Sequence, residues 1–167
     1  MTYVVIDNFL ENFQEICDTL YDIISFEYKN VHLWHDIDNQ NRFSKISNKV
    51  LNEVKIRYDT SKCVGFEIWT HNKSLASNGL YHIDKDEYLM KTKEEYSYPI
   101  CSSVLYLSAQ LAFDNGKLFI ENDVITPKEN RLIIFDSGIP HRVSPISVID
   151  KRCSLNINFW NYKINLI

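Results

Sequence analysis

The sequence predicts a mainly β protein of the α+β class, in which short strands form a sandwich or barrel and two N-terminal helices pack on one sheet. Three observations lead to this expectation. Apolar residues recur at steps of three and four before residue 60, whereas after Cys63 they form short runs between turn residues. Aromatic residues make up 13% of the chain, which is typical of a β-rich interior. The 167 residues are 45% hydrophobic, enough for one domain with a core.

The first 60 residues predict one strand and two amphipathic helices. YVVI at residues 3–6 indicates a short strand, after which Asp7 or Asn8 can cap a helix. The apolar positions of the first helix are Phe9, Phe13, Ile16, Leu20 and Ile24, and those of the second are Phe43, Ile46, Val50 and Val54. We therefore expect residues 1–60 to form a helical support region within a single domain that spans residues 1–167.

Residues 63–162 predict the β core of this domain. The turn signal Asp114-Asn115-Gly116 separates two of its strands. The expected strands are GFEIWTHN (65–72), LYHID (80–84), ICSSVLYLS (100–108), KLFIEN (117–122), RLIIFDS (131–137), HRVSP (141–145) and RCSLNINFWNY (152–162).

The charged stretch from Lys85 to Tyr98 is long for a hairpin loop. It is either a solvated linker or a lid, and as a lid it would cover a substrate with Tyr88, Leu89 and Met90.

The last strand has two chemically different faces. Cys153, Leu155, Ile157 and Phe159 alternate with Arg152, Ser154, Asn156, Asn158 and Trp160. The apolar face should meet the core or the helices, because successive side chains leave a strand on opposite sides. The polar face is either solvated or the lining of a barrel lumen that holds a charged ligand.

The chemistry most clearly indicated by the residues is metal binding. His82 and Asp84 are two positions apart, so on a strand their side chains would leave the same face. His141, brought in by another strand, would complete three ligands and leave the opposite face open. Two histidines and one carboxylate in this arrangement suit a non-haem Fe(II). The alternative is a surface strand pair joined by a hydrogen bond.

The composition argues against several other functions. The net charge is −4 and the pI about 5.7, without the basic stripe that nucleic-acid binding requires. No stretch reaches the length of a transmembrane helix, and the N-terminus lacks the pattern of a signal peptide. The four cysteines are widely spaced without a C-x-x-C motif, which disfavours zinc ribbons and redox sites. We expect a reduced, soluble, cytoplasmic protein that does not bind nucleic acid or membranes.

The sequence also resembles the 2-oxoglutarate- and Fe(II)-dependent oxygenases, in particular the prolyl 4-hydroxylase-like group. The resemblance covers essentially the whole chain, and the matching segments stand in the family's order. They are VVIDNFL (4–10), YHID (81–84), SVLYLS (103–108) with GKLFI (116–120), RLIIFDSGIPHRVSPI (131–146) and KRCSLNINFW (151–160).

The resemblance implies a double-stranded β-helix (jelly-roll, cupin-like), with the jelly-roll core over residues 63–162. It implies that the catalytic iron ligands are His82, Asp84 and His141. Arg152 would bind the distal carboxylate of 2-oxoglutarate, because a guanidinium can bond a carboxylate bidentately. Tyr106 would bind the same carboxylate, and Ser154 is a further candidate.

Three other polar residues are expected near the site. Arg142 is the rival to Arg152, but it would point away from its neighbour His141 on an extended strand. Asp136 is either a partner of a metal-bound imidazole or a strand-end cap. His71 matches no ligand position, although it would lie near the cavity wall.

The implied activity is hydroxylation with consumption of 2-oxoglutarate and O2, release of succinate and CO2, and ascorbate as a further candidate cofactor. The candidate substrate is a prolyl or another residue of a peptide. Two alternatives stay open: a small-molecule hydroxylase of the same chemistry, and a non-catalytic cupin-like module that binds metal or ligand. Substrate identity and oligomeric state are not determined by these motifs.

Overall fold

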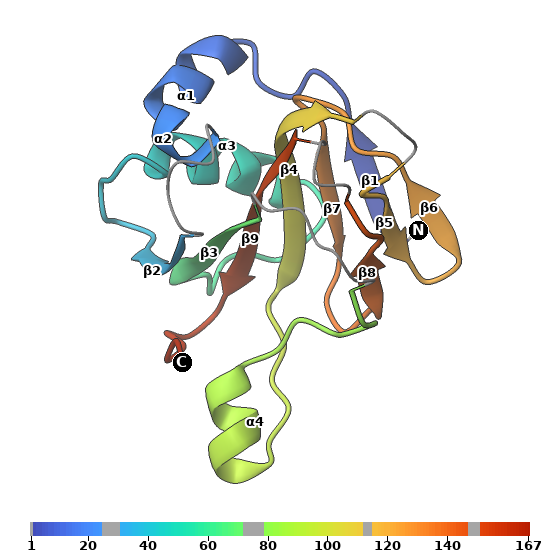
Figure 1. Ribbon diagram of the computed structural model, residues 1–167. Coiled ribbons are helices and arrows are strands. Elements are labelled where there is room, and N and C mark those ends of the chain that lie inside the picture. Colours follow the sequence, from blue (N-terminus) through green and yellow to red (C-terminus); the bar gives the residue numbers. More distant parts are fainter. Residues whose placement is uncertain (1, 25–30, 72–78, 112–114, 147–150) are drawn as a thin grey trace.

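The structure is a computed structural model that describes residues 2–24, 31–71, 79–111, 115–146 and 151–167 (Figure 1). In this part of the chain the elements are β1 (Tyr3–Ile6), α1 (Phe13–Thr19), α2 (Tyr21–Ile24), β2 (His32–Asp36), α3 (Ser44–Val54), β3 (Gly65–His71), α4 (Glu87–Lys93), β4 (Cys101–Gln110), β5 (Leu118–Ile120), β6 (Asp123–Ile125), β7 (Leu132–Asp136), β8 (His141–Val143) and β9 (Lys151–Trp160).

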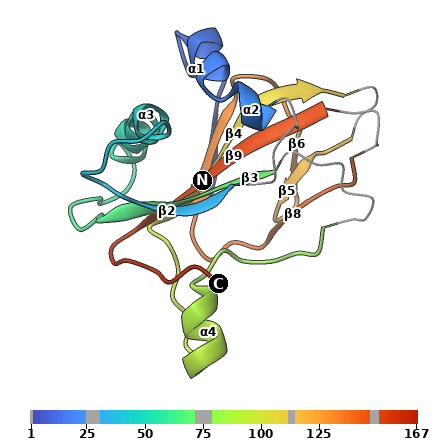
Figure 2. The same cartoon turned by 60° about the vertical axis from the view of Figure 1, so that its left-hand side comes forward.

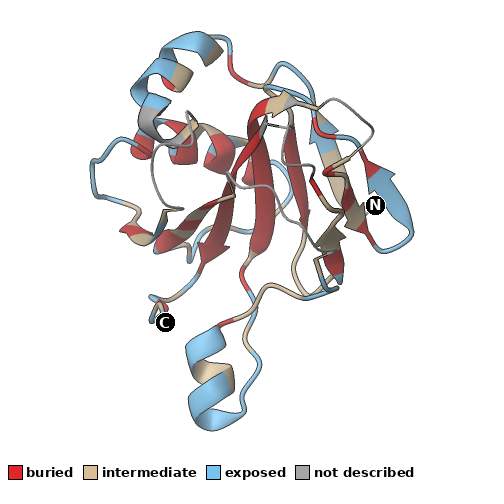
Figure 3. Ribbon diagram, in the orientation of Figure 1, coloured by how far each residue is buried: buried red, intermediate tan, exposed pale blue. Residues whose placement is uncertain are grey.

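Two antiparallel sheets form the frame of the molecule. The larger has the strand order β1-β7-β4-β9-β3-β2, and the smaller has the order β6-β5-β8. Figure 2 shows α1 and α3 on one side of the larger sheet and β5 and β8 on the other. The strands β4 and β9 lie at its centre and are buried (Figure 3).

The alternation along β9 separates two buried layers. Cys153, Leu155, Ile157 and Phe159 pack in one apolar cluster with Ile16, Leu20, Phe43, Ile46, Val50 and Val54 of the helical region. A second cluster lies between the sheets and contains Val104, Tyr106, Leu118, Ile120, Ile125, Ile133 and Phe135. The polar face of β9 is also buried, with Arg152, Ser154, Asn156 and Asn158 each at most 5% exposed. It therefore lines the interior between the sheets and is not a solvated face.

The first helix starts later than predicted. Its N-cap is Asn12, and the run breaks into α1 and α2 around Leu20. Asp7 instead accepts hydrogen bonds from Arg131 at 2.6 and 3.0 Å, and Asn8 has a φ of +53°. Neither residue therefore caps the helix: Asp7 is in an ion pair with a distant residue, and Asn8 has a left-handed backbone conformation. The second helix, α3, lies where the apolar periodicity predicted it.

The segment 80–84 is not a regular strand, contrary to the prediction. It forms a single antiparallel bridge, between His82 and His141, and a further backbone hydrogen bond runs from Gly79 N–H to Val143 O at 3.1 Å. A Cβ at Gly79 would lie 3.0 Å from that carbonyl oxygen, so the backbones approach closely there. Asp114 and residues 72–78 lie outside the described residues.

Three elements were not predicted. The strands β2 and β6 add edge strands to the two sheets, and β2 lies within the region expected to be helical. The stretch 85–98 contains α4, whose N-cap is Asp86, and the Asp86 carboxylate accepts the Leu89 N–H at 2.9 Å. The helix projects from the sheets and has no buried residue (Figures 1 and 3). Closure of this segment as a lid stays a prediction.

Candidate metal centre

A backbone bridge places the two histidines of the predicted ligand set side by side. His82 N–H donates to His141 O at 3.0 Å, and His141 N–H donates to His82 O at 2.9 Å. Directly opposite residues of an antiparallel pair direct their side chains to the same face. The imidazole centroids consequently lie 4.4 Å apart. Asp84 follows two residues after His82 and joins the same cluster.

The ligand atoms of His82, Asp84 and His141 all lie within 4.8 Å of one another. Asp84 Oδ1 is 3.5 Å from His141 Nε2 and 3.9 Å from His82 Nε2. His141 and Asp84 are nearly buried, whereas the His82 side chain is 55% exposed. The cluster therefore has a closed side, formed by the protein, and an open side.

A second set of hydrogen bonds orients each of these three side chains. His82 Nδ1 lies 3.1 Å from Leu80 O, and His141 Nδ1 lies 3.0 Å from Ile139 O. Because a carbonyl only accepts, both Nδ1 atoms carry the proton and both Nε2 atoms can serve as metal ligands. Ser102 donates to Asp84 Oδ2 at 2.7 Å, which leaves Oδ1 facing the histidines.

The electrostatics of the cluster favour a cation. Burial alone would raise the pKa of Asp84, but the hydrogen bond and charge of His141, followed by the Ser102 hydroxyl, lower that pKa below its ordinary value. Burial alone would lower the pKa of His141, yet the Asp84 carboxylate and the Ile139 carbonyl raise it. Asp84 is thus held as a carboxylate in a largely buried position, as a metal ligand must be.

Arg152 lies in the same cavity as these three residues. It is 2% exposed, and its Cζ lies 5.1 Å from the ring centroid of Tyr106. The cavity is lined by side chains from both sheets, among them His82, Asp84, His141, Arg152, Trp69 and His71. The predicted metal ligands and the predicted anion-binding residue therefore face one enclosed space.

The polar atoms around Arg152 lack partners in the described structure. Arg152 Nε and Nη1, Tyr106 Oη and Ser154 Oγ are buried without a hydrogen bond. Ser154 and Tyr106 are directly opposite each other on β9 and β4, so these donors converge. A buried guanidinium without a counter-ion is costly, and a carboxylate supplies the missing acceptors. These residues fit a ligand that reaches from the metal to Arg152 and ends in a carboxylate.

The other polar candidates lie elsewhere. Arg142 stacks on Phe119 with its Cζ 4.0 Å from the ring centroid, and on Tyr81 at 5.1 Å. Asp136 accepts the Tyr58 hydroxyl at 2.7 Å and does not bond to either metal-cluster histidine. His71 accepts the Trp69 indole N–H at 3.1 Å through Nε2. Burial, followed by the charges of Arg152 and His82, lowers the pKa of His71 to about 4, so this imidazole is neutral.

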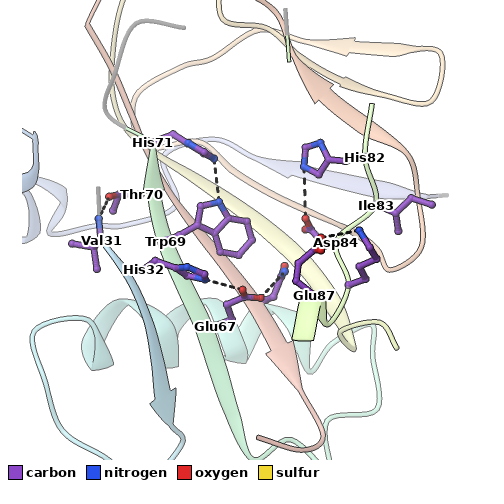
Figure 4. Close-up of a pocket in the computed structure, with 12 residues that line it drawn as sticks. Val31, His32, Glu67, Trp69, Thr70, His71, His82, Ile83, Asp84 and Glu87 are labelled. Atoms are coloured by element: carbon purple, nitrogen blue, oxygen red, sulfur yellow. Dashed lines mark hydrogen bonds and ion pairs between the residues drawn. The ribbon is translucent and has the colours of Figure 1, made fainter. Parts of the chain in front are cut away.

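A groove of about 300 Å³ opens on the exposed side of the metal cluster (Figure 4). It is lined by His82 and Asp84 and by residues of β3 that include Glu67 and Trp69. A second hollow of about 350 Å³ lies beside His82 and is lined by Tyr81, Tyr96, Tyr98 and Met90. Both hollows are open to solvent, and α4 stands beside them.

Sequence reasoning missed two residues of this site. Ser102 donates a hydrogen bond to the Asp84 carboxylate. Its position could have been predicted from Tyr106, because residues i and i+4 of a strand lie on the same face. Glu67 lines the groove and is two positions before Trp69 on β3, so the two side chains lie on the same face of that strand. Neither belongs to a recognisable motif.

Comparisons with known proteins agree with this arrangement. Residues 71–160 match the family model described as the 2OG-Fe(II) oxygenase superfamily. A comparison with curated protein sequences finds no match.

Among solved structures, a Pseudomonas putida prolyl-4-hydroxylase is 16% identical with a TM-score of 0.67 and covers 97% of this chain and 94% of that one. A viral collagen prolyl hydroxylase from Paramecium Bursaria Chlorella virus-1 is 15% identical with a TM-score of 0.66 and coverages of 96% and 91%. A Trichoplax adhaerens prolyl hydroxylase, in complex with a hypoxia inducible factor peptide fragment, is 14% identical with a TM-score of 0.64 and coverages of 96% and 84%.

These likenesses confirm the predicted fold class, a mainly β double-stranded β-helix of the jelly-roll type with N-terminal helices on one sheet. No helix in the described ranges is long and apolar enough to span a bilayer.

Proposed function

We propose that this chain, which belongs to the 2OG-Fe(II) oxygenase superfamily, hydroxylates a residue of a peptide and releases succinate and CO2. The family assigns it the activity of a dioxygenase, an oxidoreductase that uses Fe(II), 2-oxoglutarate and O2. When bound, Fe(II) supplies the oxidising chemistry with O2, and the protein supplies ligands, orientation and shielding.

In this proposal His82, Asp84 and His141 hold the iron. Their support is the ligand cluster within 4.8 Å and the hydrogen bonds that direct both Nε2 atoms and Asp84 Oδ1 inward. Two imidazoles and one carboxylate on one side leave further coordination positions open, as this chemistry requires.

Arg152 anchors 2-oxoglutarate at the inner end of the cavity. The observation that carries the proposal is its buried guanidinium, which has donors without partners and shares one cavity with the metal cluster. Tyr106 Oη and Ser154 Oγ complete the cradle for the distal carboxylate. A non-catalytic metal-binding module would have no use for a buried cation at this place.

A peptide is favoured over a small molecule because the site opens into two grooves that are open to solvent, each lined in part by a residue of α4, Glu87 or Met90. The Trichoplax enzyme in the comparisons holds a peptide fragment, which supports the same view. A small-molecule hydroxylase of identical chemistry is the second candidate.

The test is an anaerobic titration of the protein with Fe(II) and 2-oxoglutarate, followed by the visible charge-transfer band of the iron chelate. We expect the band in the natural protein and its loss in His141→Ala and Arg152→Ala. Arg142→Ala is the matched control, because Arg142 stacks outside the cavity. Absence of the band, or its persistence in Arg152→Ala, would contradict the proposal. Succinate release with a peptide panel then tests turnover.

A further inference from the structure

We infer that the groove outside the metal cluster binds a basic side chain of the substrate, lysine or arginine, through Glu67 and Asn158. This inference rests on the proposed function, because it assigns the substrate class for that same site. Glu67 lies on β3 and Asn158 lies directly opposite it on β9. Both line the groove that His82 and Asp84 also border.

Within the described residues, Glu67 is the groove carboxylate that has no lysine or arginine partner. The other carboxylates that line this groove are Asp84, which belongs to the metal cluster, and Glu87. Glu87 is paired with Lys85 at 2.7 Å. Among the described residues, the side-chain contacts of Glu67 are with His32 Nε2 at 2.9 Å, an ion pair when that imidazole is protonated, and with Asn158 Nδ2 at 3.4 Å. Because a carboxylate offers about four acceptor positions, positions remain for a ligand.

The side-chain carbonyl of Asn158 is a second, independent indication that a hydrogen-bond donor binds in this groove. The residue is 2% exposed, and its Oδ1 is buried without a hydrogen-bond partner in the described structure. Its Nδ2 faces Glu67, which fixes the orientation of the amide. A lone carbonyl oxygen beside a carboxylate needs a ligand rich in N–H donors. Ammonium offers three such donors and guanidinium five, and neither accepts a hydrogen bond.

Trp69 makes the same place suitable for a cation. It is two residues after Glu67 on β3, and its ring lies between Glu67 and His71 in Figure 4. The bond from its indole N–H to His71 at 3.1 Å holds the ring in position. Aromatic rings attract cations, and Trp does so best. The aliphatic stem of a lysine or arginine would lie along the same ring.

The negative charge of Glu67 and the positive charge of Arg152 are too far apart to neutralise each other. Glu67 pairs with Asn158, and six residues along β9 separate Asn158 from Arg152, a distance of about 20 Å at strand geometry. The cavity that contains Arg152 is therefore suited to an anion, and the groove that contains Glu67 is suited to a cation. His82 and Asp84 line both the cavity and the groove. A substrate with a basic side chain matches this polarity.

The experiment measures peptide binding by calorimetry, independently of turnover. The probes are blocked pentapeptides of glycine with a central lysine, arginine, norleucine or proline, and free lysine is a further arm. The whole chain is titrated as purified and after anaerobic loading with Fe(II) and 2-oxoglutarate. We expect the lysine and arginine peptides to bind about 10- to 100-fold more tightly than the norleucine peptide, since a charge-assisted bond has that value.

Glu67→Gln should bring the lysine peptide to the affinity of the norleucine peptide, and the equally charge-changing control Glu11→Gln, on an exposed residue, should not. Asn158→Leu provides a second variant if Glu67→Gln fails to fold, and it should weaken binding of the lysine and arginine peptides but not of the norleucine peptide. Equal affinity for lysine and norleucine, no binding of either basic peptide, or a preference that survives in folded Glu67→Gln would overturn the inference. Tight binding of free lysine would support the cation site and assign a free amino acid as its source.

Failure of this inference is separable from failure of the proposed function. A charge-transfer band without a basic-peptide preference rejects the inference alone. Preference for basic peptides without the band rejects the proposed chemistry and leaves a cation-binding groove.

Discussion

His82 and His141 are joined by two reciprocal backbone hydrogen bonds, of 3.0 and 2.9 Å, in the one bridge that connects the 79–84 segment to β8. The bridge sets their rings 4.4 Å apart, and each ring is oriented by the carbonyl two residues before it. The backbone therefore preorganises two of the three proposed metal ligands, and Ser102 does the same for Asp84. Such support from outside the ligand set commonly governs metal affinity.

Removing the Ser102 hydroxyl should weaken metal binding without removing a ligand. In Ser102→Ala, Asp84 loses the 2.7 Å bond to Oδ2 and can rotate away from the histidines. We expect the Fe(II) affinity to fall about 10- to 100-fold, measured by anaerobic competition with a chelator. Ser61→Ala, at an exposed position, is the control and should bind iron as the natural protein does. An unchanged affinity in Ser102→Ala would show that Asp84 is held by other contacts.

Replacing Arg152 with Met should separate stability from cosubstrate binding. The ligand-free protein keeps a buried guanidinium with unpartnered donors, so an apolar side chain of similar length should raise the unfolding free energy by about 1 kcal/mol or more. The cosubstrate should stabilise the natural protein, by about 2.7 kcal/mol at 100 times its Kd, but should not stabilise Arg152→Met. Thermal unfolding with and without Fe(II) and 2-oxoglutarate checks both effects. Arg57→Met, at an exposed position, should retain the ligand-induced shift.

Gly116 should influence Arg152 through direct contact. It has a φ of +63°, and a Cβ would lie 3.1 Å from Arg152 Cδ. Gly116→Ala should lose about 1–2 kcal/mol of stability from backbone strain and should also bind 2-oxoglutarate more weakly, because Arg152 must shift.

Gly138 offers a matched control for that substitution. Its φ is +76°, but nothing lies within 4 Å of the corresponding Cβ. Gly138→Ala should therefore lose similar stability and keep its cosubstrate affinity. Equal 2-oxoglutarate affinities in the two variants, measured by calorimetry, would contradict the role given to this contact.

Acid should destabilise the protein partly through His35. Burial lowers the pKa of this imidazole, which lies 2.9 Å from Asn41 Nδ2 and 3.1 Å from Ser44 Oγ at the start of α3. The unfolded chain binds a proton near pH 6.5, before the folded protein does. The contribution of His35 is therefore complete above about pH 6.5 and is lost as the pH falls towards the lowered folded pKa.

The measurement is urea unfolding at several pH values between 5 and 8. In His35→Gln the dependence of the unfolding free energy on pH should be shallower below pH 6.5, by at most about 1.4 kcal/mol per pH unit. Parallel pH profiles for the natural protein and the variant would show that His35 does not titrate differently on folding.

Several features could be predicted from local sequence because their physical cause is local. The 3–4 periodicity of α3 and the strict alternation of β9 reflect burial of one face, which each segment encodes by itself. The alternation also placed Arg152 and Ser154 on one face and Cys153 on the other. The double-stranded β-helix followed from the order of motifs, since no periodicity distinguishes it from other β sandwiches.

Other predictions were wrong because the structure of the segment depends on residues elsewhere in the chain. Asp7 was expected to cap a helix, but Arg131, 124 residues away, takes its carboxylate. The 80–84 segment has the composition of a strand, yet among the described residues its one β-bridge is between His82 and His141. The helix α4 in the stretch 85–98 was not predicted, although its N-cap, Asp86, is a local signal. The many charged residues of this stretch favoured a loop instead.

The sequence by itself determined the chemical types available to the site: two imidazoles, a carboxylate and a guanidinium in a family's order. Only the tertiary structure decided their spatial relations, because the bridge between His82 and His141, the bond from Ser102 to Asp84 and the unpartnered donors around Arg152 join residues from separate strands. It also decided that Glu67 and Asn158 meet at the outer groove, since strand pairing, which no local pattern records, brings them face to face.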